Sequence, residues 1–233
     1  MKTSRYFIYI IGLLLSCSSP KYTLQANEET IIEVQSEKDS SIMAIISPYQ
    51  QAIESEMKEV ITYTKTNLTK EGIQSTLGNF VTDLCLNYAD AHICFMNNGG
   101  LRTSLIKGEI TRGDIYKVMP FENELVVVEL SENNLIELLK YITSRNGEPF
   151  SGMNIIMNNK GELIDYTLPV NFDKEEKISI LTSDYLANKL QFLKDKKQQK
   201  VGVKLRDAII DYCTKTDTID VKIDNRIKIL KNE

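Results

Sequence analysis

The sequence predicts an α/β (α+β) fold in a single domain, with a mixed β-sheet and flanking helices. Three observations support this prediction. Strand-like and helix-like hydrophobic patterns alternate along the chain, one pair of strands is joined by a hairpin signal, and the 233 residues are 42% hydrophobic and 26% charged. That composition is ordinary for a soluble globular domain, and the length is sufficient to bury a sizeable core.

The first half of the chain is predicted to alternate helices and strands. In order these are a helix over 39–58, a strand over 59–65, a helix over 76–91, a strand over 93–96 and a short helix over 114–119. We expect Pro48 to interrupt the first helix, because proline lacks the N–H that a helix interior needs. Thr111 is suited to cap the short helix, and Pro120 to end it.

The second half continues the alternation and adds the hairpin. The predicted elements are a strand over 125–130, a helix from 131 to 142, two hairpin strands over 154–157 and 162–168, a strand over 177–181, a helix after 183, a helix over 203–215 and a closing strand over 219–223. Ser131 and Ser183 are the predicted helix caps. The residues 158–161, Asn-Asn-Lys-Gly, supply the turn between the hairpin strands.

Charge and histidine content exclude two classes of function. With 28 basic and 32 acidic residues the net charge is −4, whereas a nucleic-acid-binding protein would show a basic excess. A hydrolytic site with two metal ions needs several imidazole and carboxylate ligands, and the chain has a single histidine, His92. We therefore expect no metal site in this chain, and we expect His92, at the start of a buried strand, to be structural.

The N-terminus has the features of a targeting segment. Two basic residues precede an apolar run of about ten residues, which ends in Leu-Leu-Ser-Cys at Cys17. This pattern predicts a lipoprotein signal peptide over 1–16, lipid attachment at Cys17 and a polar tether over 17–37, followed by the folded domain over 38–233. The alternative is an ordinary signal peptide with an incidental cysteine. The lipoprotein interpretation predicts a bacterial envelope protein anchored to the membrane.

Three further cysteines remain, at positions 85, 94 and 213. They are an odd number, and no Cys-x-x-Cys pair is present. Cys85 falls in a helical pattern and Cys94 in a strand pattern. We therefore expect buried apolar side chains rather than a metal site or a disulfide framework.

The segment 97–123 holds the most informative candidates for a binding site. After the strand over 93–96 the chain reads Asn-Asn-Gly-Gly-Leu-Arg, in which two glycines permit close approach of the backbone to a ligand and Arg102 offers a fork of donors for phosphate or carboxylate. A tight turn beside a surface arginine is the commoner explanation of such a stretch. Phe121 and Tyr185 each follow a predicted element, at places that could face a cleft or belong to the core.

Taken together, these segments resemble the C-terminal, substrate-binding domain of the 5'-nucleotidase family. The resemblance rests on Leu-Gly-Asn-Phe-Val-Thr-Asp at 77–83, Asn-Asn-Gly-Gly-Leu-Arg at 97–102, Gly-Glu-Ile-Thr-Arg-Gly-Asp at 108–114, Val-Met-Pro-Phe-Glu-Asn at 118–123, Leu-Val-Val-Val-Glu-Leu at 125–130 and Tyr-Leu-Ala-Asn at 185–188. It covers roughly residues 40–230. The order and spacing of several separate motifs make it far more specific than one glycine pair.

The resemblance implies a set of substrate-binding residues. They are Asn97, Asn98, Gly99, Gly100, Arg102, Phe121, Asn123, Tyr185 and Asn188. In this family the arginine binds phosphate oxygens, the two aromatic residues enclose the nucleobase, and the polar residue at 123 can reach the edge of the base. Such a site is physically coherent, because two aromatic faces can hold any base and charge-assisted hydrogen bonds can hold the anion.

Two departures from the family pattern affect these expectations. The family's metallophosphatase domain, with its two metal ions, is not recognisable in a sequence with one histidine. The family also continues Leu-Ala-Asn with Gly-Gly-Asp, whose carboxylate binds the ribose hydroxyls, whereas here Asn188 is followed directly by Lys189. A deletion of three residues at this point puts the ribose contact, and the placement of the second aromatic residue, in doubt.

The leading functional hypothesis is therefore a substrate-binding module of a 5'-nucleotidase-type phosphohydrolase that binds a nucleoside, a nucleotide or a related phosphate ester. A separate metallophosphatase chain would supply divalent metal ions and catalysis, and this chain would need no cofactor and bind no nucleic acid polymer. The alternative from another class is a non-catalytic binding or scaffold lipoprotein on the same fold, with degraded nucleotide recognition. An independent hydrolase is a third reading, for which the sequence offers no nucleophile or acid–base pair.

Overall fold

The computed structural model describes residues 39–168 and 177–230, and the described residues from 44 onward belong to one compact unit. The predicted signal peptide, Cys17 and the whole predicted tether lie outside the described residues. The mixed α/β architecture predicted from the sequence is confirmed: six helices and three mixed sheets are present in the described part of the chain. In that part, no helix combines the length and the apolar character that crossing a bilayer requires.

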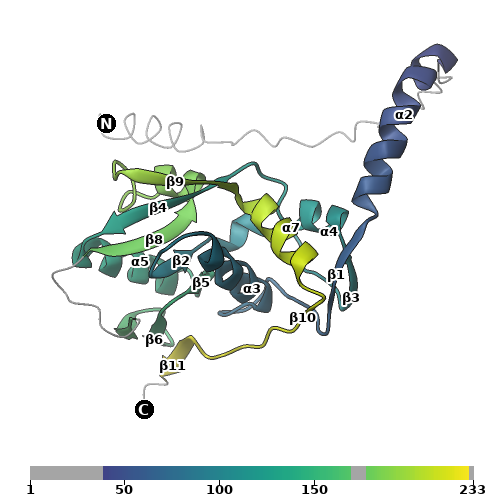
Figure 1. The fold of residues 1–233 in the computed structure, drawn as a ribbon. Coiled ribbons are helices and arrows are strands. Elements are labelled where there is room, and N and C mark those ends of the chain that lie inside the picture. The colour runs from purple at the N-terminus through teal and green to yellow at the C-terminus, as the bar shows by residue number, and fades with distance from the viewer. Residues whose placement is uncertain (1–38, 169–176, 231–233) are drawn as a thin grey trace, which may run out of the picture. The chain divides into compact units, whose positions relative to one another are not determined.

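The largest sheet has five strands in the order β5-β2-β8-β4-β9 (Figure 1). Its strands are β5 (Phe150–Ser151), β2 (Ile93–Phe95), β8 (Ile178–Ser183), β4 (Glu124–Leu130) and β9 (Gln198–Lys204). Strand β2 runs parallel to β8, and β4 runs antiparallel to β8 with Leu125 opposite Ser183. The carboxyl ends of β2 and β8 and the amino end of β4 therefore meet at the same end of the sheet.

Both faces of this sheet are covered, because its central strands alternate buried residues between two cores. On one side Val126, Val128 and Ile180 pack in a core with helix α5 (Glu132–Ser144). On the other side Leu125 and Leu181 join helices α3 (Thr76–Cys85) and α7 (Leu205–Lys215). A sheet buried on both faces is rich in Val, Ile and Leu, which accounts for the apolar run over 125–130.

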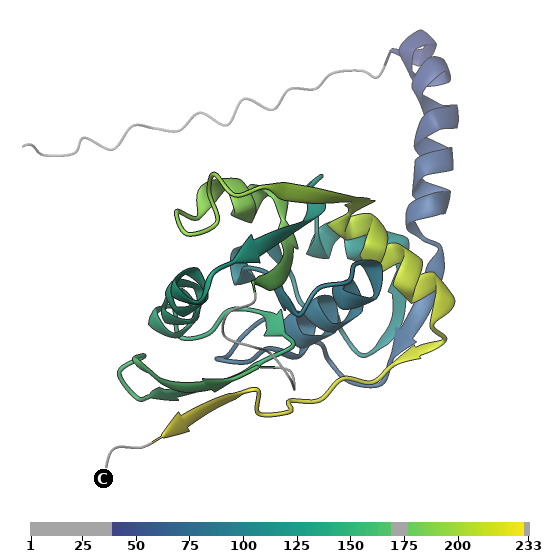
Figure 2. The ribbon, with the colours of Figure 1, turned by 60° about the vertical axis from the view of Figure 1, so that its left-hand side comes forward.

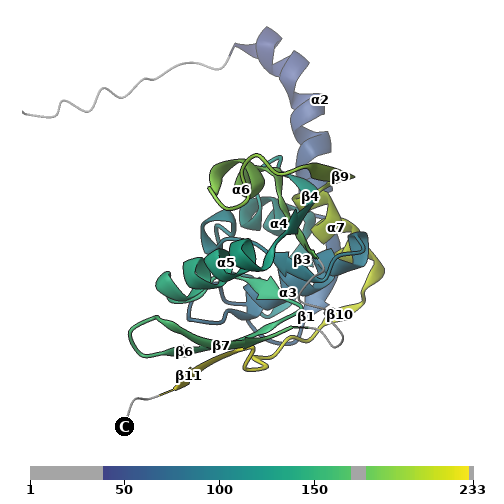
Figure 3. The same ribbon diagram turned by 90° about the vertical axis from the view of Figure 1, so that its left-hand side faces the viewer.

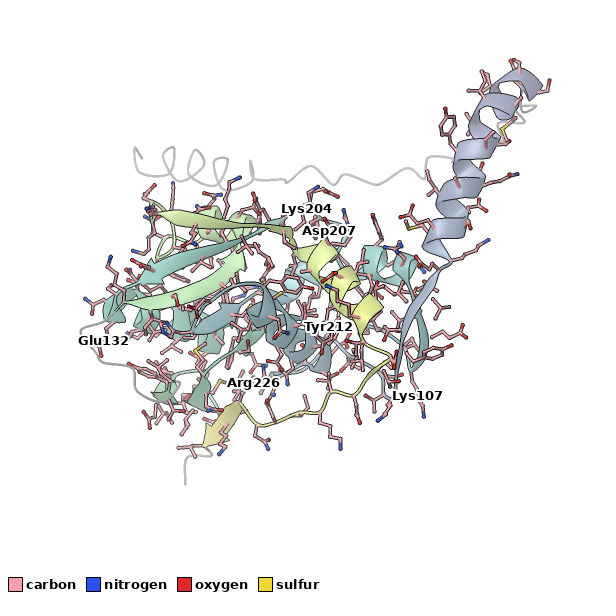
Figure 4. All side chains as sticks on the ribbon, viewed as in Figure 1. Lys107, Glu132, Lys204, Asp207, Tyr212 and Arg226 are labelled. Carbon is pink, nitrogen blue, oxygen red and sulfur yellow. The ribbon has the colours of Figure 1, made fainter. Side chains whose placement is uncertain are left out.

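Two smaller sheets complete the domain (Figures 2 and 3). One has the order β10-β1-β3, with β10 (Thr218–Ile219), β1 (Val60–Thr64) and β3 (Gly108–Thr111). The other has the order β11-β6-β7, with β11 (Ile227–Leu230), β6 (Asn154–Asn158) and β7 (Leu163–Thr167). The predicted hairpin is the pair β6–β7. The buried Arg226, just before β11, donates to Asp83 of α3 and to the carbonyl of Phe150, and so ties this sheet to the main one (Figure 4).

Several predicted elements need correction. Helix α2 (Ser40–Met57) continues through Pro48, which removes a single N–H from a helix that has no buried residue and whose carbonyl groups water can reach. The helix predicted over 76–91 ends at Cys85 and is followed by a 3₁₀ turn, η1 (Leu86–Tyr88). The helix predicted from 203 begins at Leu205, and the strand predicted over 219–223 is only β10.

Two short helices, α4 (Arg112–Val118) and α6 (Asp184–Lys189), are well capped. In α4 the Thr111 side chain accepts from the N–H of Asp114, whose carboxylate accepts from the N–H of Thr111, which is a capping box. In α6 the Ser183 hydroxyl accepts from the N–H of Leu186 at 3.2 Å. The predicted caps Thr111 and Ser183 are thus confirmed, and they fix how the chain enters each helix.

Candidate functional site

A pocket of about 630 Å³ lies at the end of the five-stranded sheet where β2 and β8 finish and β4 starts. Its size is in the range that holds small-molecule ligands. It is lined by Asn97, Gly99, Gly100, Arg102, Phe121, Asn123, Tyr141, Arg145, Glu148, Tyr185, Leu186, Lys189 and Leu190. Seven of the nine substrate-binding residues named from the sequence are among them. The carboxyl ends of strands are a usual place for ligands in α/β sheets.

The first wall of the pocket is the loop that follows β2. Here Asn98–Gly100 forms a 3₁₀ turn, η2, in which the N–H of Gly100 donates to the carbonyl of Asn97 at 3.0 Å. This bond uses one of the two glycine amides that the sequence suggested for a ligand. A Cβ atom on Gly100 would lie 3.2 Å from Asn97 Oδ1, so the absence of a side chain leaves room for Asn97.

Arg102 leaves this loop as an exposed cation. Its N–H donates to the carbonyl of Val118 at 2.8 Å, which fixes the backbone against α4. Its side chain donates to the carbonyl of Gly99 at 3.3 Å and lies with its guanidinium carbon 6.0 Å from the centre of the Phe121 ring. A guanidinium in contact with an aromatic ring at the rim of a pocket is available to an anionic group of a ligand.

Two aromatic residues reach the pocket from different elements. Phe121 precedes β4 and is 41% exposed, and Tyr185 lies in the first turn of α6 and is 45% exposed. Large aromatic rings normally gain free energy from burial, so two exposed rings that line one pocket are the feature of a binding surface. The deletion after Asn188 has therefore not removed Tyr185 from the pocket. Asn123 lines the same wall, with its carbonyl accepting from the N–H of Leu205 at 2.9 Å.

The other two residues named from the sequence do not line the pocket. Asn98 supports the loop from behind, because its side-chain amide donates to the carbonyl of Gly147 at 3.2 Å. Asn188 accepts a hydrogen bond from Gln198 of β9 at 2.9 Å and donates to the carbonyl of Asp184. Both asparagines therefore have structural hydrogen bonds, and a direct contact with substrate stays a prediction for each.

Several lining residues were missed in the sequence. Tyr141 and Arg145 come from the last turn of α5, and Glu148 follows it. Nothing in their local sequence marks them as part of a site, apart from the spacing of four residues that places Tyr141 and Arg145 on one helix face. Lys189 lies four residues after Tyr185, and that spacing could have indicated it.

Glu148 is a buried carboxylate that connects two walls of the pocket. It is 4% exposed, and its Oε2 accepts from the N–H of Asn98 at 2.6 Å. Its Oε1 accepts from Arg145 Nε at 2.5 Å. This hydrogen bond raises the pKa of Arg145 above its usual value, so the guanidinium remains charged. A buried carboxylate is stable only when it is paired and hydrogen-bonded, and Glu148 has both kinds of partner.

Lys189, at the end of α6, adds a further positive charge to the lining of the pocket. Its Nζ donates to the Tyr185 hydroxyl at 2.5 Å and lies 4.9 Å from the centre of the Tyr185 ring. The hydrogen bond to Tyr185 raises the pKa of the ammonium group. The charged residues of the lining are therefore Arg102, Arg145 and Lys189 against Glu148, and this predicts an anionic ligand.

The remaining reactive side chains do not form a second centre in the described residues. Within 39–168 and 177–230, no group of three or more His, Cys, Asp and Glu side chains is arranged to hold a metal ion. His92 is exposed and accepts from the N–H of Ser179 at 3.1 Å, as the structural interpretation predicts. Cys85, Cys94 and Cys213 are free and buried, as expected, and burial raises the pKa of the Cys213 thiol to about 12.

The fold and the pocket define a mixed-sheet domain with a pocket, lined by aromatic and basic residues, at one end of its central sheet. Residues 56–192 match the family described as 5'-nucleotidase, C-terminal domain. The match covers more than half of the chain, and the chain belongs to this family. The resemblance stated from the sequence motifs is thereby confirmed.

Individual relatives agree with this assignment. An apyrase of Tabanus yao is 25% identical over 229 residues, which cover 82% of this chain and 41% of the apyrase. A 5'-nucleotidase of Vibrio vulnificus is 24% identical over 124 residues, or 51% of this chain and 22% of that protein. The crystal structure of a 5'-nucleotidase precursor from Thermus thermophilus superposes with a TM-score of 0.69 at 25% identity, covering 80% of this chain and 42% of that one. The chain thus spans less than half the length of each of these relatives.

Proposed function

We propose that this chain is the substrate-binding module of a 5'-nucleotidase-type phosphohydrolase and binds a nucleoside phosphate in the pocket at the end of β2, β8 and β4. The observation that carries the proposal is the shared lining: the exposed aromatics Phe121 and Tyr185 and the exposed Arg102 line one pocket of about 630 Å³. The three residues come from separate parts of the sequence. Their convergence is what a bound nucleotide would need.

The physical roles follow from the side chains. The rings of Phe121 and Tyr185 offer stacking surfaces for a base, each worth about 1–3 kcal/mol by alanine substitution. Arg102 presents N–H groups in a fork that matches a phosphate group. Asn123, on the same wall as Phe121, can donate to or accept from the edge of a base. Binding of this kind orients a phosphate ester without itself cleaving it.

We further propose that catalysis requires divalent metal ions held outside the described part of this chain, on a metallophosphatase partner. Resemblance to the family supports this idea, since its members combine the present domain with a metallophosphatase domain. The purified chain alone is expected to release no phosphate from AMP, with or without added Mg²⁺, Mn²⁺ or Zn²⁺. Turnover that survives a second chromatographic step and is lost in Arg102→Ala would contradict the proposal.

Calorimetry with adenosine and AMP tests the binding role. The wild-type chain should bind both weakly, and Arg102→Ala should weaken AMP more than adenosine, because only AMP offers a phosphate to the guanidinium. Insertion of Gly-Gly-Asp between Asn188 and Lys189 should strengthen adenosine binding, since the carboxylate would add an acceptor for the ribose hydroxyls. Absence of binding in all three proteins would favour the scaffold lipoprotein as the alternative function.

We also propose that the mature protein is anchored by lipid on Cys17 in a bacterial envelope membrane. The support is the apolar run that ends at Ser16 and Cys17. An alkyne fatty acid should label the wild-type chain in cells and leave Cys17→Ala unlabelled. Label retained by the variant at wild-type level would overturn the lipid anchor and leave an ordinary signal peptide.

A further inference from the structure

The pocket holds more positive charge than one phosphate group needs. Three cations and one carboxylate line it, although the whole chain has a net charge of −4. Arg102 is on the loop after β2, Arg145 is at the end of α5, and Lys189 is at the end of α6. The cations therefore come from three different elements, and Arg102 alone accounts for the phosphate in the proposed function.

Arg145 is held in place by the protein, but only part of its guanidinium takes part in the interactions that hold it. The buried carboxylate of Glu148 accepts from Arg145 Nε at 2.5 Å, and its other oxygen is occupied by the N–H of Asn98. The guanidinium carbon lies 5.4 Å from the centre of the Tyr141 ring, which supports the side chain from a second direction. Within the described residues the two terminal nitrogens of Arg145 have no hydrogen-bond partner, and its side chain is 56% exposed. The free part of the guanidinium is thus a positioned donor pair.

Lys189 is oriented in a comparable way. Its ammonium group gives one hydrogen bond to the Tyr185 hydroxyl and lies over the Tyr185 ring, which leaves two N–H donors without a described partner. In the sequence it follows Asn188 directly, at the point where the family pattern would continue with Gly-Gly-Asp. A donor at this place favours an anionic substituent over a hydroxyl group.

We propose that Arg145 and Lys189 form a second anion subsite, and that the site prefers a nucleotide with a phosphate on its ribose in addition to the 5'-phosphate. This inference rests on the proposed function, because it assumes that a base lies between Phe121 and Tyr185. Arg102, beside Phe121, binds one phosphate, while Arg145 and Lys189 bind the other. Charge-assisted hydrogen bonds to two anchored cations make the second phosphate a large contribution to affinity.

Calorimetry with four ligands tests the subsite: adenosine, AMP, ADP and adenosine 3',5'-bisphosphate. The wild-type chain should bind the bisphosphate at least about tenfold more tightly than AMP, the gain expected for charge-assisted hydrogen bonds. The ratio of the two affinities should fall to below about threefold in the double variant Arg145→Gln, Lys189→Gln. It should also fall as the salt concentration rises, because screening weakens exposed ion pairs.

A matched control removes two positive charges outside the pocket. Lys194 and Lys197 are exposed and do not line the pocket, so the double variant Lys194→Gln, Lys197→Gln should keep the wild-type ratio. Arg145 and Lys189 are also exposed, and thermal melting is expected to show that the variants fold. A ratio that falls equally in the control variant would overturn the subsite, since net charge alone would then explain the gain.

The remaining outcomes separate this inference from the proposed function. If adenosine and AMP bind but the bisphosphate binds no better than AMP, the second subsite is wrong and the proposed function stands. If ADP binds more tightly than AMP by the same factor as the bisphosphate does, the subsite does not select a phosphate on the ribose, and the stated ligand class is wrong. If no nucleotide binds, the proposed function itself fails, and this inference fails with it.

Discussion

The two ends of the central sheet carry hollows of similar size but of different chemistry. At one end the pocket of about 630 Å³ is lined by two exposed aromatic residues, a glycine pair and three cations. At the other end, near the start of β8 and the end of β4, a hollow of about 570 Å³ is lined by Asp90, Val127, Glu129, Ser131, Asn134, Lys177, Ser179, Lys196, Lys197 and Gln199. The described residues that line this second hollow include no aromatic ring.

This difference shows why volume alone does not identify a binding site. In the second hollow Lys177 is paired with Glu129 at 3.0 Å, as two exposed charges on adjacent strands often are. In the first, exposed rings and cations converge on a single space, and a buried carboxylate, Glu148, fixes one of the cations. Glu148 is already paired within the protein, but an exposed aromatic ring lacks the free energy of burial, and a ligand that covers the ring would supply it.

The largest expected effect is a loss of stability on substitution of Gly147, which lies next to Glu148 in the wall of the first hollow. Gly147 has φ +97°, and a Cβ atom there would lie 1.9 Å from the Ile73 carbonyl oxygen. Gly147→Ala should lower the free energy of unfolding by about 2–5 kcal/mol, the sum of backbone strain and overpacking. Gly202 of β9 has φ +82°, and a Cβ atom there would have no atom within 4 Å apart from its chain neighbours, so Gly202→Ala should cost only the strain, about 1–2 kcal/mol.

Urea unfolding of the two glycine variants gives this comparison directly. The two positions share a left-handed backbone and differ in the space around them. Equal losses of stability in Gly147→Ala and Gly202→Ala would show that the close approach of Ile73 to Gly147 has no energetic importance. The tight packing beside Glu148 could then not be what holds this wall of the pocket.

The next largest effect is a difference between the two hollows in how substitutions change adenosine affinity. Phe121→Ala and Tyr185→Ala should each weaken adenosine binding by about 1–3 kcal/mol, because each removes one stacking face. In the second hollow, Lys196→Ala and Lys197→Ala should leave adenosine affinity unchanged within error. Calorimetry on the four variants measures this. An equal loss of affinity at both ends of the sheet, or a loss only in the lysine variants, would show that the nucleoside does not bind specifically in the first hollow.

The smallest expected effect is a pH dependence at the rim of the first hollow. Hydrogen bonds from Lys204, at the junction of β9 and α7 (Figure 4), and from Arg206 lower the pKa of Glu122 from 4.5 to about 2. A lowered pKa means that the folded state stabilises the ionised carboxylate of Glu122 relative to the unfolded state. The resulting stability is complete above pH 4.5 and is lost as the pH falls toward 2.

Acid unfolding monitored by circular dichroism tests this sign. The difference in stability between wild type and Glu122→Gln should shrink as the pH is lowered from about 5 to about 2. The effect should be small, since Glu122 is exposed. Lys204→Met should reduce the difference in the same window, because it removes the first partner of Glu122. If the difference in stability between wild type and Glu122→Gln stays constant over this pH range, the lowered pKa of Glu122 is contradicted.

The long periodic elements could be predicted from sequence, whereas several short or polar strands could not. Helix α5, strand β4 and the β6–β7 hairpin were expected with nearly their observed bounds, because burial on regular faces leaves a clear hydrophobic period. Strand β9 was missed, since it is a polar edge strand whose residues Gln198–Lys204 are mostly exposed. Strands β3, β5 and β11 have two to four residues each, too few for a period to show.

Some residues of the candidate site could likewise be predicted from the sequence, and others could not. Phe121, Arg102 and Tyr185 were recognised because motifs of the family surround them. Arg145 and Glu148 were not, because they matter only through Asn98, about fifty residues earlier, whose N–H the Glu148 carboxylate accepts. A contact between residues so far apart in sequence leaves no trace in either local segment.

By itself the sequence determined the family, the order of most helices and strands, and the aromatic and basic residues available for a site. Only the tertiary structure decided that these residues share one pocket. It does so because β2 and β8 pair in parallel and β4 pairs antiparallel to β8, which brings two strand ends and one strand start to the same end of the sheet. It also decided that Asn98 and Asn188 bond to protein partners instead of lining the pocket. Strand pairing and buried hydrogen bonds join distant segments, so they are properties of the folded chain as a whole.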